Sequence, residues 1–130
     1  MMMKFTCNTG ELNQGINSAL LAVSPKSTLL ALEGILVRVT TKEITLMSYN
    51  LEMGITAIVD AKVEKTGEII IPAKVFSDII RRIESDEVTI EADDRCLVQI
   101  TGGVSQFTIL GMTSEEFPEL PEVGLSLIHI

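Results

Sequence analysis

One pattern occurs twice along this chain and constrains its fold more than any other feature: a strand, a helix and then three strands. The first copy has a strand over 4–9, a helix from an N-cap at Thr9 to about Val23, and strands over 31–41, 43–50 and 52–63. After a turn over 63–67, the second copy has a strand over 67–72, a helix over 72–85, and strands over 87–93, 95–101 and 105–112. Such a duplication predicts an α+β fold, with both helices on one side of antiparallel sheets.

The first helix is amphipathic, and its polar face is nearly uncharged. Apolar residues recur at helical spacing and should face the core: Leu12, Ile16, Leu20 and Val23. The opposite face carries amide and hydroxyl groups: Asn13, Gln14, Asn17 and Ser18.

The second helix carries a small basic cluster in an otherwise acidic chain. Its apolar stripe is Phe76, Ile79, Ile80 and Ile83, and Pro72 fits an early helical position. The residues outside the stripe are Lys74, Asp78, Arg81 and Arg82. One interpretation is an ordinary solvated face, in which Asp78 pairs with an arginine one turn away. The other is phosphate contact, which the acid-poor face of the first helix favours.

Charge and composition limit how nucleic acid could be bound. The formal net charge is −8, with 18 acidic and 10 basic residues. This balance argues against a domain that grips nucleic acid tightly, but it allows weak contact on one local face. A platform for stacking bases is not expected, because the chain has no tryptophan and one tyrosine.

No catalytic or metal-binding motif stands out in the sequence. The single histidine, His129, is next to the last residue, and there is no P-loop, GxGxxG or HExxH motif. A hydrolase built on Asp93, Asp94 and Cys96 would need a cleft where an exposed hairpin is expected. Cys7 and Cys96 are interpreted as reduced packing residues of a cytosolic protein. No signal peptide or membrane-spanning helix is expected either.

Three segments carry a family resemblance: MKFTCNTGELNQGINSALLAVSPKSTLLALEGILVRVT, ITLMSYNLEMGITAIVDAKVEKTGEIIIPAKVFSDIIRRI and FTILGMTSEEFPELP. They resemble the first domain of the bacterial sliding clamp, the beta subunit of DNA polymerase III, over residues 3 to about 123. The most specific motifs are NLEMGI (50–55), IPAKVFSDIIR (71–81) and FPELP (117–121).

The resemblance implies a DNA-clamp fold and a function. Clamps of this family have three such domains per subunit, and two subunits close head-to-tail into a ring around duplex DNA. The helices line the hole, and the ring gives the replicative polymerase its processivity. The resemblance also implies no catalysis, no cofactor and no metal, and a location in the bacterial cytoplasm at the nucleoid.

Carried over to this chain, the resemblance assigns two sets of residues. The positions expected to face DNA are Lys26, Lys74 and Arg81, whereas Arg82 has no firm counterpart. The positions expected at the subunit interface are Arg95, Phe107 and Ile109. Val104 and Gln106 stand where some relatives have arginine, so this interface should be less ionic.

The resemblance also limits what this chain should do by itself. Residues 1–123 are expected to be the first clamp domain, and 124–130 a truncation or cloning scar. Polymerase and clamp loader should bind mainly through domains that this chain lacks, and one domain should not close a ring. The alternative function is a protein-interaction module that uses an edge strand and has no role at DNA.

Overall fold

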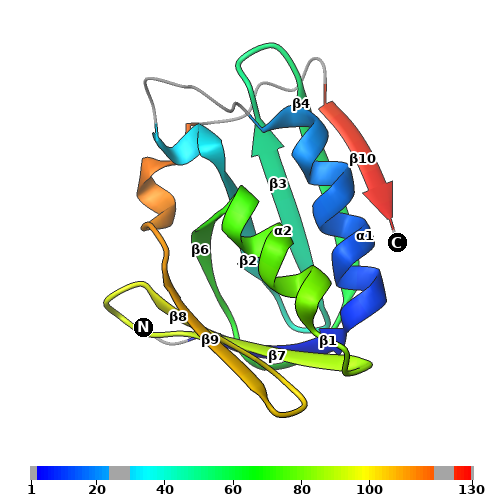
Figure 1. Ribbon diagram of the computed structural model, residues 1–130. Coiled ribbons are helices and arrows are strands. Elements are labelled where there is room, and N and C mark those ends of the chain that lie inside the picture. The colour runs from blue at the N-terminus through cyan, green and yellow to red at the C-terminus, as the bar shows by residue number, and fades with distance from the viewer. Residues whose placement is uncertain (1–2, 24–29, 119–124, 130) are drawn as a thin grey trace.

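The computed structural model describes residues 3–23, 30–118 and 125–129 (Figure 1). It contains two α-helices, α1 (Thr9–Ala19) and α2 (Ala73–Arg82), and three 3₁₀ turns, η1 (Leu20–Ala22), η2 (Leu30–Glu33) and η3 (Ser114–Glu116). The strands are β1 (Met3–Asn8), β2 (Gly34–Val39), β3 (Glu43–Tyr49), β4 (Gly54–Asp60), β5 (Lys62–Lys65), β6 (Gly67–Pro72), β7 (Glu87–Ala92), β8 (Leu97–Gly102), β9 (Ser105–Leu110) and β10 (Leu125–His129).

The two copies of the repeat interlock through their first strands. One sheet has the order β5-β1-β7-β8-β9, and the other has the order β10-β4-β3-β2-β6. Strand β1 therefore pairs with β7 of the second copy, and β6 pairs with β2 of the first, both antiparallel. Within each copy the three strands after the helix form an antiparallel meander, β2-β3-β4 in the first and β7-β8-β9 in the second. The duplicated α+β architecture is confirmed.

The predicted turn over 63–67 is wrong, because Lys62–Lys65 forms the edge strand β5. Val63 pairs with Phe5 of β1, and its side chain is partly buried against the core. Lysines stand at both ends of the strand, and charged residues are common on edge strands, where they discourage pairing with other chains. The strand predicted over 52–63 accordingly ends at Asp60, and Ala61 separates β4 from β5.

Both helices lie side by side on one side of the sheets (Figure 1). Helix α1 packs on β3 and β4, whereas α2 packs on β2 and β6. The predicted stripes face the core: Leu12, Ile16, Phe76, Ile79, Ile80 and Ile83 are buried, and Leu20 and Val23 are partly buried. One core cluster includes residues of both sheets and both helices, so this packing fixes the position of the helical surface.

The predicted N-cap of the first helix, Thr9, is wrong. The N-cap of α1 is Asn8. Asn8 has an extended backbone, and its side-chain oxygen accepts a hydrogen bond of 2.9 Å from Glu11 N. Thr9 is already helical and is buried, and its N–H donates to Asp86 O at 2.9 Å. The capping oxygen must come from the extended residue that precedes the first helical one, which here is the exposed Asn8.

Two predicted helix ends are also later than the observed ones. The first helix leaves α geometry after Ala19 and continues as the single 3₁₀ turn η1. The second ends at Arg82, since Ile83 is extended and its N–H bonds to Ile80 O at 3.2 Å.

The segment that was expected to be a scar forms a strand. Leu125–His129, as β10, pairs in parallel with β4, from Leu125 beside Gly54 to His129 beside Ile58. It is the one parallel pair in either sheet among the described residues. Whether 124–130 is foreign to the domain stays a prediction.

Candidate nucleic-acid interface

The outward surface of α1 and α2 is the site that the sequence singled out. Asn13 near the start of α1 and Arg81 near the end of α2 line the same pocket, so the two helices run in opposite directions. In the following, "two-helix face" means the solvent-facing side chains of Thr9–Ala19 and Ala73–Arg82.

The α1 half of this face is polar, as predicted. Gln14 and Asn17 are exposed, while Asn13 and Ser18 are half-buried. Glu11 is the only acidic residue of α1, and it lies in the first turn, where a negative charge stabilises the helix dipole. This half therefore offers hydrogen-bonding groups with little charge.

The α2 half carries the basic side chains, and Lys74, Arg81 and Arg82 are all exposed. At about 100° per residue, Lys74 and Arg81 lie about 20° apart around the helix axis. Arg81 shares a pocket with Asn13 of α1, so this pair of cations stands on the side of α2 nearest α1. Arg82 lies about 100° further round, on the flank away from α1. The geometry groups Lys74 with Arg81 and separates Arg82.

Arg81 is not a free cation, because Asp78 forms an ion pair with its guanidinium one turn earlier. Arg81 Nε also donates a hydrogen bond of 3.4 Å to Ser77 O. The side chains of Arg81 and Asp78 are 58% and 42% exposed, so solvent screens the pair and its net stabilisation is small. Among the residues that the structure describes, Lys74 and Arg82 form no ion pair.

The third position expected to face DNA, Lys26, lies outside the described residues.

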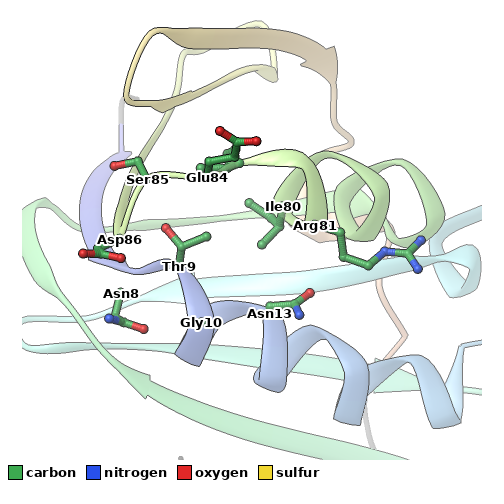
Figure 2. A pocket seen from close by; sticks show the side chains of 10 residues that line it. Asn8, Thr9, Gly10, Asn13, Ile80, Arg81, Glu84, Ser85 and Asp86 are labelled. Carbon is green, nitrogen blue, oxygen red and sulfur yellow. The ribbon is translucent and has the colours of Figure 1, made fainter.

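A pocket of about 380 Å³ lies between the N-terminus of α1 and the C-terminus of α2. Figure 2 shows Thr9 and Asn13 on α1 across from Ile80 and Glu84. Thr9 Oγ1 and Asn13 Oδ1 are shielded from solvent and have no hydrogen-bond partner in the structure. Glu84 and Asp86 are exposed residues that also line the pocket, so this end of the face is acidic. Neither acid was singled out from the sequence, although Glu84 falls within the helix predicted over 72–85 and Asp86 follows that range directly.

The predicted interface residues lie elsewhere, around the edge strand β9. Phe107 and Ile109 are partly buried against the core, and Ile109 pairs with Val98 of β8. Arg95 is exposed in the turn before β8. Gly111 N donates to Cys96 O at 2.7 Å, so this turn lies beside the end of β9. The structure therefore brings the three residues to one edge of one sheet.

The two positions at this edge where some relatives have arginine are exposed. Val104 is fully exposed in the β8–β9 turn, and Gln106 is exposed on β9. Leu110 is also exposed and adds an apolar side chain to this edge.

The alternative hydrolase site is not supported, because the Asp93 carboxylate has a structural role. A hollow of about 160 Å³ does lie beside Asp93, Asp94 and Cys96, where only an exposed hairpin was expected. However, Asp93 Oδ1 accepts hydrogen bonds from Arg95 N at 2.8 Å and Leu97 N at 3.0 Å. The carboxylate thus holds the turn of the hairpin that was expected at this position.

Other chemistry is limited within the described ranges. Burial, with smaller effects of Glu11 and Glu87, raises the pKa of the Cys7 thiol to about 12, so it is an inert packing group. Cys96 is half-buried against the core, and neither cysteine forms a disulfide. Over residues 3–23, 30–118 and 125–129, no three acidic, cysteine or histidine side chains are grouped to hold a metal ion. The described helices include none with the length and apolar character needed to span a membrane.

An internally doubled α+β domain, with two antiparallel helices side by side on one side of its sheets, is a DNA-clamp domain. Residues 3–121 match the family model described as the DNA polymerase III beta subunit, N-terminal domain, and the chain belongs to this family.

Relatives and solved structures agree with this assignment. The chain is 30% identical to the beta sliding clamp of Staphylococcus epidermidis, over 95% of this chain and 35% of that protein. It is 33% identical to the beta sliding clamp of Synechococcus elongatus, over 93% of this chain and 33% of that protein. The sliding clamp of Bacillus subtilis superposes with a TM-score of 0.89 at 25% identity, over 94% of this chain and 34% of that one. The DNA polymerase III beta subunit of Thermotoga maritima superposes with a TM-score of 0.84 at 27% identity, over 92% of this chain and 32% of that one. The chain spans about a third of the length of these relatives.

Proposed function

We propose that this chain is the DNA-facing first domain of a sliding clamp, which keeps a replicative polymerase on its template and catalyses no reaction itself. The two-helix face carries the proposal. It has two acids, Glu11 and Asp78, and three bases, Lys74, Arg81 and Arg82, in a chain whose net charge is −8. A face with one base more than acids on an acidic protein attracts phosphate there and repels it elsewhere, including at the acidic end beside Glu84 and Asp86.

Weak contact is what encircling DNA requires. Lys74 and Arg81 can each approach one phosphate, and the amides of Gln14 and Asn17 can donate hydrogen bonds to phosphate oxygens. Contacts of this kind carry no sequence information and release few counterions, so the protein can move along the duplex.

The proposal includes three kinds of macromolecular partner. Duplex DNA would bind the two-helix face through Lys74, Arg81 and Lys26. A second clamp subunit would bind the β9 edge through Arg95, Phe107 and Ile109. Polymerase and clamp loader would bind mainly through the remaining length that the relatives have. The location that follows is the bacterial cytoplasm, at the nucleoid.

The salt dependence of DNA binding tests the DNA-facing role. Fluorescence anisotropy with a labelled duplex from about 20 to 200 mM salt should show weak binding that falls steeply as salt rises. Lys74→Ala should reduce the slope of log K against log salt by about 0.9. Lys65→Ala is the matched control, because Lys65 is an exposed lysine on the edge strand β5. An equal slope for Lys74→Ala and the wild type would remove Lys74 from the DNA-facing surface.

The same experiment separates the alternative function. A module that binds only proteins through its β9 edge would show no DNA binding at the lowest salt. In that case, the wild type and both lysine variants would be indistinguishable.

A further inference from the structure

Asp78 occupies the centre of the basic cluster of α2. It lies four residues after Lys74, three before Arg81 and four before Arg82, and residues three or four apart are neighbours on a helix surface. No other acid lies within α2. Asp78 is therefore the nearest possible acidic partner on the helix for each of the three cations.

The structure shows which cation takes that partner. Asp78 pairs with Arg81, while Lys74 and Arg82 form no ion pair in the described part of the chain. The pair is well exposed, so it is weak enough for an incoming phosphate to break. A phosphate that binds Arg81 competes with that carboxylate for the guanidinium, and it meets the repulsion of Asp78 as it approaches.

We propose that Asp78 is a tuning residue that weakens the contact between Arg81 and DNA phosphate and so keeps the two-helix face loosely bound. This inference rests on the proposed DNA-facing function. In this proposal an acidic residue has a role on a face otherwise defined by its cations. Asp78 makes the affinity for DNA lower than three unpaired cations would give. In a sliding protein, that lower affinity favours movement along the duplex.

Asp78→Asn tests the proposal, and the chain offers a matched control. Glu68 also forms an exposed ion pair, with Arg38, and Glu68→Gln changes the net charge by the same amount. Although α2 packs on β6 and β2, the side chains of Glu68 and Arg38 line a separate pocket with Leu36 and Met47, which belong to a core cluster that includes no residue of α1 or α2. Circular dichroism should show both variants folded, because neither residue is buried.

The readout is anisotropy of a labelled duplex across a series of salt concentrations. Asp78→Asn should bind about two- to fivefold more tightly at the lowest salt, which is the effect that an exposed pair of this kind can have. Its slope should steepen by up to about 0.9, because Arg81 then contacts phosphate fully. Glu68→Gln should remain close to the wild type. In an Arg81→Ala background, Asp78→Asn should have less effect, because its main partner is gone.

The remaining outcomes overturn the proposal in different ways. An equal increase in DNA affinity for Asp78→Asn and Glu68→Gln would show an effect of net charge alone. Unchanged affinity for Asp78→Asn, with a reduced slope for Lys74→Ala, would reject the role of Asp78 and keep the DNA-facing function. No binding by the wild type or any variant at the lowest salt would overturn both.

Discussion

Ile70 and Met112 exchange two backbone hydrogen bonds, of 2.9 Å from Ile70 N to Met112 O and 2.8 Å from Met112 N to Ile70 O. Through this bridge the segment after β9 joins the free edge of β6. In the first copy, β5 follows β4 and pairs with β1 in the same way. The chain therefore returns, after the third strand of each meander, to the first strand of its own copy.

Gly111→Ala should destabilise this bridge. A Cβ at Gly111 would lie 2.7 Å from Ile70 O, which is backbone and cannot turn aside. We expect the free energy of unfolding to fall by about 1–3 kcal/mol in urea denaturation. Val104→Ala is the control and should stay within about 0.5 kcal/mol, because Val104 is fully exposed. Equal stabilities for the two variants would mean that the segment after β9 adapts freely.

Ser48→Ala should weaken the end of α1. The buried Ser48 Oγ donates a hydrogen bond of 2.6 Å to Ala19 O, the last residue of the helix. Its loss leaves a buried carbonyl without this donor, and we expect a cost of about 1–3 kcal/mol in thermal or urea unfolding. Ser18→Ala removes a bond of 3.2 Å to Gln14 O from a half-buried side chain on the helix surface and should cost little. A Ser48→Ala variant as stable as Ser18→Ala would contradict this role.

Glu68 should make a small contribution to stability that depends on pH. Its hydrogen bond with the Arg38 side chain lowers the pKa of the Glu68 carboxyl below its usual value of 4.5. A lowered folded-state pKa gives stability that is present above the unfolded-state pKa and is lost as pH falls through the folded-state pKa. Because the pair is exposed, Glu68→Gln should lower Tm only slightly at pH 7. The difference from the wild type should shrink as pH falls through the folded-state pKa of Glu68, and a difference that stays constant over the acid range would point to packing instead.

Phe107→Ala should weaken subunit association in a protein that carries this chain with the remaining length of its relatives. If Phe107 is a buried anchor at the β9 edge, the dimer should lose more than about 1 kcal/mol in analytical ultracentrifugation. Since Phe107 is also partly buried against its own core, Phe107→Leu is needed to separate loss of packing from loss of contact. Dimer dissociation that is unchanged in both variants would refute the proposed interface.

The strongly periodic segments of the fold could be predicted from the sequence. Alternation and helical spacing found both helices and the strands that frame the core, because burial of one face repeats along each element. The strand β5 was missed, since its residues are charged and it contributes little buried surface. The pairing of β1 with β7 was not predicted either, because periodicity does not identify the partner of a strand distant in the sequence.

The candidate site was predicted in its composition more than in its geometry. Helical spacing placed Lys74 and Arg81 on one face and offered Asp78 as a partner at a distance of one turn. Which cation Asp78 takes depends on side-chain conformation, which spacing does not determine. Glu84 was not singled out although it falls within the helix predicted over 72–85, and Asp86 lies in the link before β7, where no period applies.

The interlocked first strands also determine how the molecule could be divided. A cut at the exposed Thr66, between β5 and β6, would leave the first piece without the β6 partner of β2. The second piece would lack the β1 partner of β7. Each piece would hold the strand that the other needs, so the two should recover the native structure only together. The domain is thus suited to fragment complementation, in which two separately made polypeptides fold on meeting.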